Sequence, residues 1–222
     1  MGGERDWGAL GMKAEFSHKI ALVTGACTPL GTEVVESLAR QGVLVAAVDG
    51  DGPRLAELVE RLQRAGVRIA GRQIDVRSSA AVDALVDQVE REFGPIDAVV
   101  SVAAALRPGP ALSISDEDWA HSFGVNADGV FHVSRAVATR MVARRRGTIV
   151  VVAAHTATVP RTSVAAYAAS RAAAIAYTEC LAAEVAARGV HCAVVAPDDA
   201  RRVVDEVGFL LADTVRHPAQ SA

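Results

Sequence analysis

The sequence predicts an α/β protein with a doubly wound parallel sheet of about six strands and helices on both faces. Short runs of consecutive apolar residues recur along the chain, and longer segments with helical character separate them. The apolar runs have no polar face, which is typical of parallel strands that helices cover on both sides. Of the 222 residues, 51% are apolar and 22% charged, which is enough for one large core.

The predicted elements alternate between strand and helix. Six apolar runs predict strands at 20–23, 43–48, 67–76, 98–102, 148–154 and 190–195. Apolar side chains at helical spacing, or long alanine-rich stretches, predict helices at 32–40, 55–65, 80–93, much of 116–145, 165–187 and 203–212. Gly42 is placed to end the first helix in a left-handed conformation. Right-handed crossovers would then distribute the helices over both faces of the sheet.

One domain at 17–222 is expected to follow a flexible leader at 1–16. Lysine and arginine number 23, aspartate and glutamate number 26, and aromatic residues make up 4%. A protein with a net charge of −3 and few aromatic residues is a poor ligand for nucleic acid.

No apolar run approaches the roughly 18–20 residues of a membrane helix. Three cysteines without a CxxC pair indicate reduced thiols and a cytoplasmic location, and no metal site is expected.

A glycine-containing turn follows the first strand and reads Thr24-Gly25-Ala26-Cys27-Thr28-Pro29-Leu30-Gly31. Thr28 can cap the next helix and Pro29 can be its first residue, so that the helix start faces an anion. A plain strand-to-helix turn would have the same pattern. Asp49 ends the second strand, where an acidic side chain suits a ribose 2′-hydroxyl and repels a 2′-phosphate. This predicts NAD as the cofactor, unless Asp49 is a solvated loop residue.

The turn resembles the TGxxxGxG motif of the short-chain dehydrogenase/reductase family, with Pro29 at the middle glycine. Tyr167 and Arg171 resemble the family's YxxxK element. The resemblance implies a Rossmann-like fold, Tyr167 as general acid/base, and Arg171 in the lysine's place beside the tyrosine and the nicotinamide ribose. Asn126 matches the asparagine that links this lysine to a proton-relay water. The family's serine falls at Ala154, which has no hydroxyl. Tyr167 as a surface or interface residue remains the alternative.

The same resemblance implies a full set of binding residues. Cofactor contacts are expected from Thr24, Gly25, Thr28, Leu30, Gly31, Asp49, Asp75, Val76, Ser101 and Arg171. Stretches around Leu106, Asn126 and Arg161 resemble 2,3-dihydro-2,3-dihydroxybenzoate dehydrogenases in particular. That resemblance places substrate contacts at Leu106, Arg107, His155 and Arg161. Paired arginines suit a benzoate-like carboxylate, although solvated loop arginines would have the same sequence.

The resulting hypothesis is an oxidoreductase that moves hydride between NAD(H) and a secondary alcohol or ketone. The expected substrate is small, cyclic and carboxylated, as in siderophore or aromatic secondary metabolism. The alternative is a catalytically degenerate member that serves as partner or scaffold subunit of an active reductase. Pro29, Ala154 and Arg171 favour it, as does the absence of the lid and last strand expected after Pro197. A nucleotide-sensing module is a third reading. A homodimer, or a heteromer with an active homologue, is expected.

Overall fold

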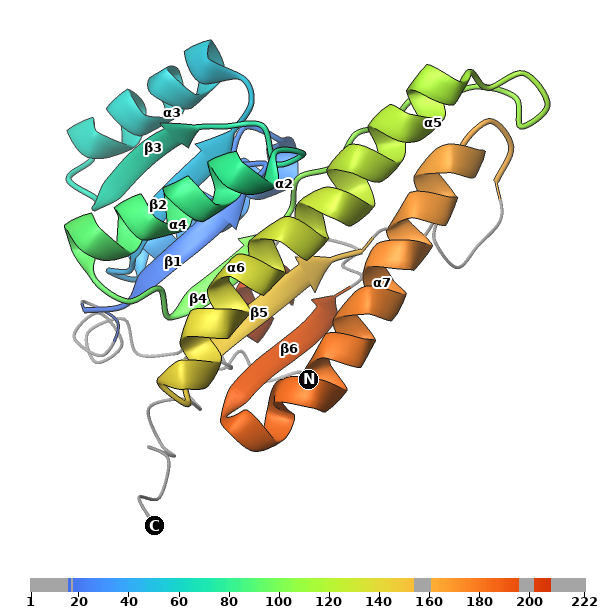
Figure 1. The fold of residues 1–222 in the computed structure, drawn as a ribbon. Helices are drawn as coiled ribbons and strands as arrows, with labels where there is room; N and C mark the ends of the chain where they lie inside the picture. The colour runs from blue at the N-terminus through green and yellow to red at the C-terminus, as the bar shows by residue number, and fades with distance from the viewer. Residues whose placement is uncertain (1–15, 17, 154–160, 196–201, 209–222) are drawn as a thin grey trace, which may run out of the picture.

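A six-stranded parallel sheet forms the centre of the molecule, as the sequence predicts (Figure 1). The structure is a computed structural model that describes residues 16, 18–153, 161–195 and 202–208. Residues 202–208 are helical. The other helices and strands follow one another as β1 (Ile20–Thr24), α2 (Pro29–Arg40), β2 (Leu44–Asp49), α3 (Gly52–Arg64), β3 (Ile69–Gln73), α4 (Ser79–Phe93), β4 (Ala98–Ser101), α5 (Asp116–Phe123), η1 (Gly124–Asp128), α6 (Gly129–Ala143), β5 (Gly147–Val152), α7 (Ala165–Val185), η3 (Ala186–Arg188) and β6 (Val190–Val195).

The strand order in the sheet is β3-β2-β1-β4-β5-β6. The chain adds β2 and β3 on one side of β1 and then β4, β5 and β6 on its other side, so the switch point lies between β1 and β4. Every pair of neighbouring strands in this sheet is parallel. In such sheets the loops that follow the two central strands diverge to opposite faces and leave a crevice at the carboxyl ends of the strands. Thr24 and Ser101 are register partners at these ends. A ligand site is therefore expected beyond them.

Alternating strand side chains build a core on each face of the sheet. Ala21 and Val23 pack with α2, α3 and the helical segment 202–208. Ile20 and Leu22 pack on the other face with α4, α6 and α7, which lie side by side in Figure 1. Each fully buried valine or leucine side chain contributes about 1.5–3 kcal/mol to stability. The strands read as continuous apolar runs because both of their faces are covered.

The long helix predicted at 116–145 is three elements in the structure. A π-helical turn, η1, separates α5 from α6. Two glycines flank this turn, and a Cβ on Gly129 would lie 2.8 Å from Cγ2 of Val76. The loop after β3 thus presses directly on the helix backbone. Such π turns occur frequently at functional sites, and a contact between distant segments cannot be read from periodicity.

Two segments lie at the ends of the predicted domain. Phe16, the last residue of the expected leader, is buried. Of the helix predicted at 203–212, residues 202–208 are helical and the others lie outside the described residues. Among the described helices, none combines the length and the apolar character needed to span a membrane.

Candidate active site

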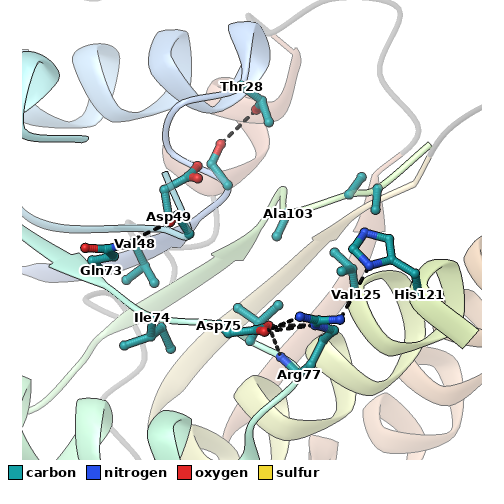
Figure 2. Close-up of a pocket in the computed structure, with 15 residues that line it drawn as sticks. Thr28, Val48, Asp49, Gln73, Ile74, Asp75, Arg77, Ala103, His121 and Val125 are labelled. Carbon is teal, nitrogen blue, oxygen red and sulfur yellow. Dashed lines mark hydrogen bonds and ion pairs between the residues drawn. The ribbon is translucent and has the colours of Figure 1, made fainter. Parts of the chain in front are cut away.

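A cavity of about 640 Å³ opens at the carboxyl ends of the strands (Figure 2). Its walls come from the loops after β1, β2, β3 and β4 and from α5 and η1. The lining residues are Gly25, Thr28, Val48, Asp49, Gly50, Gln73, Ile74, Asp75, Val76, Arg77, Ala103, Ala104, Ala105, His121 and Val125. Five residues predicted for the cofactor lie among them, namely Gly25, Thr28, Asp49, Asp75 and Val76. The sequence prediction and the cavity therefore coincide at the switch point of the sheet.

Two glycines allow the chain to pack tightly at the turn after β1. Gly25 has a φ of +70°, and a Cβ on it would lie 2.5 Å from the nitrogen of Ala103. A Cβ on Gly31 would lie 2.0 Å from the carbonyl oxygen of Gly25. A larger residue at Gly25 would push the loops after β1 and β4 apart, and a larger residue at Gly31 would push α2 away from the turn that precedes it. The turn thus requires glycine at both predicted positions.

Pro29 begins α2, as predicted, and leaves one backbone donor at the helix start. Thr28 is the N-cap and its Oγ1 accepts a hydrogen bond from the Gly31 N–H at 3.0 Å. The N–H groups of Cys27 and Thr28 donate to Asp49 and to the Gly25 carbonyl. Within the described part of the chain, the Leu30 N–H has no acceptor. The helix start can therefore still offer a hydrogen bond to an anion.

Asp49 is held as a fixed acceptor at the end of β2. One carboxylate oxygen accepts from the Cys27 N–H at 2.9 Å and the other from the Asp51 N–H at 3.0 Å. The carboxylate borders the cavity (Figure 2). Burial and the negative charge of Asp49 raise the pKa of the Cys27 thiol to about 11. At this part of the cavity, the Asp49 carboxylate can accept hydrogen bonds from hydroxyl groups of a ligand, and its charge repels anions.

A residue that the sequence analysis passed over, Arg77, lies at the opposite side of the cavity. Its Nε lies 3.0 and 2.9 Å from the two carboxylate oxygens of Asp75, and its Nη2 lies 2.6 Å from Oδ2. Its Nη1 lies 3.4 Å from Nδ1 of His121. Hydrogen bonds from Arg77 lower the pKa of the Asp75 carboxyl. The sequence did contain a signal for this ion pair, because an aspartate and an arginine two residues apart at a strand end can pair with each other.

Tyr167 and Arg171 lie one turn apart on α7. Tyr167 is half-buried, whereas Arg171 is only 3% exposed. Burial lowers the pKa of Arg171, and interaction with Tyr167 partly opposes this. Nη1 of Arg171 has no hydrogen-bond partner among the described residues. A buried cationic group without a partner is costly, which is characteristic of a group that a ligand completes.

Asn126 connects the loop after β4 to α7, the helix that carries Tyr167 and Arg171. Its side chain accepts from the Ala105 N–H at 2.7 Å and donates to the Ala105 carbonyl at 3.0 Å. The second amide hydrogen goes to Oγ of Ser170 at 2.9 Å, and Ser170 donates to the carbonyl of Tyr167. Both amide hydrogens are thus used within the protein. The side chain holds the position of α7 relative to the cavity, and the link to a relay water stays a prediction.

Five predicted cofactor residues, Arg171 among them, do not line the cavity. Thr24 and Ser101 are buried at the strand ends, and the Thr24 carbonyl accepts from the Val102 N–H at 3.1 Å. Leu30 packs against the core, so only its backbone can reach a ligand, and Gly31 acts through the close approach already described.

Three of the four predicted substrate residues, Leu106, Arg107 and Arg161, lie on two loops that do not line the cavity. Gly109 forms a parallel bridge with Val164, and the Gly109 N–H donates to the Ser163 carbonyl at 2.9 Å. This bridge joins the loop of Leu106 and Arg107 to the segment that begins at Arg161. All three side chains are exposed. His155 and Ala154 lie outside the described residues.

Comparisons with known proteins agree with this architecture. The profile of the short chain dehydrogenase family matches residues 19–201. A 2,3-dihydro-2,3-dihydroxybenzoate dehydrogenase of Bacillus subtilis is 47% identical over 179 residues, which cover 81% of this chain and 69% of that protein.

Two solved structures are similar in three dimensions. An NAD⁺-bound xylitol dehydrogenase has a TM-score of 0.79 and 31% identity, with 82% of this chain and 71% of that one covered. A gluconate 5-dehydrogenase from Burkholderia cenocepacia, in complex with NADP and tartrate, has a TM-score of 0.76 and 31% identity, with 81% and 70% covered. The similar structures thus include complexes with both nicotinamide cofactors.

Proposed function

This chain belongs to the short-chain dehydrogenase family, and from that premise we propose that it is an NAD(H)-dependent oxidoreductase. It would interconvert a secondary alcohol and a ketone on a small cyclic substrate that carries a carboxylate. The single observation that carries the proposal is the buried guanidinium of Arg171, which lacks a partner for Nη1 among the described residues and lies one turn from Tyr167. The enzymes named above give no support to a non-catalytic partner subunit.

The cavity fits a dinucleotide with the phosphates at the start of α2. The free Leu30 N–H and the helix dipole would attract them. Asp49 would accept hydrogen bonds from the adjacent ribose, because its carboxylate is already oriented by two backbone N–H groups. The same charge would repel a 2′-phosphate, which supports NAD over NADP. Bound there, the nicotinamide ring supplies or accepts the hydride.

Tyr167 would exchange the proton with the substrate oxygen. In the oxidation direction its phenolate takes the hydroxyl proton while hydride leaves the same carbon, so charge does not accumulate on oxygen. Arg171 keeps a positive charge beside the phenol over the whole neutral range, and its unused donor would bind a ribose hydroxyl. Ala154 supplies no hydroxyl to orient the substrate, so we expect slow turnover.

Arg107 and Arg161 would recognise the carboxylate of the substrate. They stand on two loops that the Gly109–Val164 bridge ties together. Arg107 is already near an anion, with its Nε 4.0 Å from Oδ1 of Asp118. That pair is exposed and long, so a substrate carboxylate can replace it at little cost.

A homodimer through α5, α6 and α7 is the assembly that the surface favours. Trp119 is 43% exposed and Phe131 36%, although both are large aromatics. Ala172 and Ala176 are exposed on α7, an alanine-rich helix that also exposes Glu179 and Glu184. Exposed apolar side chains on neighbouring helices favour a surface that contacts another protein. All three cysteines are free thiols, which supports a cytoplasmic location.

The first experiment measures cofactor binding. NADH is titrated against the protein while its fluorescence and the Tm of the protein are recorded, with NADPH in parallel. We expect saturable binding of NADH, and binding of NADPH weaker by about tenfold or more. If neither nucleotide binds at millimolar concentration, the proposed function is wrong.

The second experiment measures turnover on cyclic alcohols with and without a carboxylate. Tyr167→Phe should lower kcat by about 10²–10⁴-fold while leaving the Kd for NADH unchanged. Ala154→Ser should raise kcat. NADH binding with no turnover of any substrate, and no gain from Ala154→Ser, would instead indicate a partner subunit.

A further inference from the structure

The segment that follows β3 lies against one side of the helical layer formed by α5, η1 and α6. This segment runs from residue 75 to the start of α4 at Ser79, and it contributes Asp75, Val76 and Arg77 to the lining of the cavity. The layer meets it through hydrogen bonds and close backbone packing. The residues that make these contacts are His121, Gly124, Gly129, His132 and Arg135. This wall of the cavity is therefore held from behind by η1 and the two helices that flank it.

The π turn places two of these contacts one above the other. The Gly129 N–H donates to the carbonyl of Gly124, five residues earlier, whereas an α-helix would join residues four apart. A Cβ on Gly124 would lie 3.1 Å from Cδ of Arg77, and a Cβ on Gly129 would lie 2.8 Å from Cγ2 of Val76. The wider turn thus brings two glycines against consecutive residues of the segment, and α6 begins in contact with Val76.

His132, nearly one turn further along α6, binds the backbone of the same segment. Its Nδ1 lies 3.0 Å from the carbonyl oxygen of Val76, and because a carbonyl only accepts, Nδ1 carries the hydrogen in this contact. The N–H of the same peptide group belongs to Arg77 and donates to Oδ1 of Asp75 at 2.9 Å. A peptide group is planar, so hydrogen bonds at both of its ends fix its orientation.

This segment would carry the base of the dinucleotide, an assignment that rests on the proposed function. The start of α2 would take the phosphates and Asp49 the adjacent ribose. Beyond β2 the next strand of the sheet is β3, so the base would lie over the loop that follows β3. Val76 and Val125 supply apolar side chains to the cavity there. The orientation of the peptide after Val76 therefore shapes the surface that the base meets.

We propose that His132 is a positioning residue for the base end of the cofactor. It does not line the cavity, and it acts by holding the peptide between Val76 and Arg77. Without this donor, the carbonyl of Val76 can turn toward water, and only a fraction of the molecules present the ordered wall. The apparent affinity for the base falls by that fraction, while hydride transfer at the other end of the cofactor is unaffected.

The test measures the Kd of NADH by fluorescence titration and the Ki of ADP by displacement of NADH. ADP carries the base end of the dinucleotide and lacks the nicotinamide. In His132→Ala both constants should rise by the same factor, about three- to tenfold, as expected for one hydrogen bond. His132→Asn should restore most of the affinity, because its amide can place an N–H near the position of Nδ1.

Two further variants make the test specific. Gly129→Ala places a methyl group against Val76 and should raise both constants as His132→Ala does, although it leaves the imidazole in place. Thr139→Ala, on an exposed part of the same helix, is the matched control and should change neither constant. If His132 served the fold alone, His132→Ala would lower the Tm and leave both constants unchanged.

The outcomes separate this inference from the function on which it rests. A wild type that binds NADH supports the cofactor site whatever the variants do. The role of His132 alone would be overturned by unchanged constants in His132→Ala, by no recovery in His132→Asn, or by an ADP that does not displace NADH. A Kd for NADH that rises while the Ki of ADP stays constant would overturn it as well. A wild type that does not bind NADH would overturn the proposed function and this role together.

Discussion

At the scale of single residues, Arg171 is the most unusual group in the molecule. Lysine and arginine both carry a positive charge, but the planar guanidinium has five donors that must be satisfied when it is buried. Here it is almost fully buried, and Nη1 has no partner in the described part of the chain. The protein thus keeps a costly charge at a position where packing alone would favour an apolar side chain. Function explains such a residue better than stability does.

Replacement of Arg171 by methionine should therefore separate stability from activity. Exchange of a buried, poorly paired charge for an apolar side chain of similar length stabilises proteins by about 1–4 kcal/mol in favourable cases. For a chain of this size, each kcal/mol corresponds to a Tm increase of about 2–4 °C. We expect Arg171→Met to raise the Tm and to lower kcat/KM by about 10²-fold or more.

The matched control is Arg188→Met, which removes an exposed arginine from η3. This variant should change neither Tm nor activity. Thermal unfolding and steady-state kinetics measure both quantities. A lower Tm in Arg171→Met would show that the guanidinium stabilises the folded protein.

Among the elements, the start of α2 determines how many backbone N–H groups the protein can offer to an anion. Proline at the first helical position stabilises the helix start but removes an N–H. The N–H groups of Cys27, Thr28 and Gly31 are used internally, which leaves that of Leu30 at this helix start in the described part of the chain. The element is thus well capped and carries a weaker phosphate site than one with glycine in place of Pro29.

Pro29→Gly should tighten cofactor binding at the expense of stability. The new N–H adds a donor at the helix start, so the Kd for NADH should fall by several-fold. The greater freedom of glycine in the unfolded chain should lower the free energy of unfolding by about 1 kcal/mol. Pro53→Gly, at the exposed start of α3, is the control that should lose stability without a change in Kd. An unchanged Kd in Pro29→Gly would mean that no phosphate binds at this helix start.

At the scale of the whole molecule, α5, α6 and α7 form one layer over the sheet (Figure 1). Asn126 and Ser170 join this layer to the loop after β4, and so to the cavity. The outer side of the layer exposes aromatic and alanine side chains. A second copy that covers this side would fix the same helices that hold Tyr167 and Arg171.

A charge in the middle of the exposed side of α7 should therefore break the proposed dimer. We expect Ala176→Arg to be a monomer by light scattering, since an arginine buried in an apolar contact is unpaired. Ala56→Arg introduces the same change on an exposed face of α3 and should leave the mass unchanged. A monomeric wild type, or a dimeric Ala176→Arg, would contradict the proposed interface.

Most of the fold follows from local sequence patterns. The six strands were predictable because parallel strands buried on both faces are continuously apolar, and the start of α2 was predictable from Thr28 and Pro29. Where the cavity depends on one short segment, as at Gly25 and Asp49, residues proposed from the sequence line it, and their contact with a cofactor stays a prediction. The cavity lining was not predictable at Arg77, whose place depends on contacts with α5 and η1.

Three features could be inferred from local sequence alone: the order of strands and helices along the chain, the edge of the sheet at which a ligand would bind, and the proximity of Tyr167 and Arg171 on one helix. These features depend on residues within a few turns of one another. Three others became visible in the folded structure: Arg77 pairs with Asp75, Asn126 links the loop after β4 to α7, and a π turn separates α5 from α6. Each of these depends on contacts between segments distant in the chain, and close packing sets those contacts with a precision that periodicity does not contain.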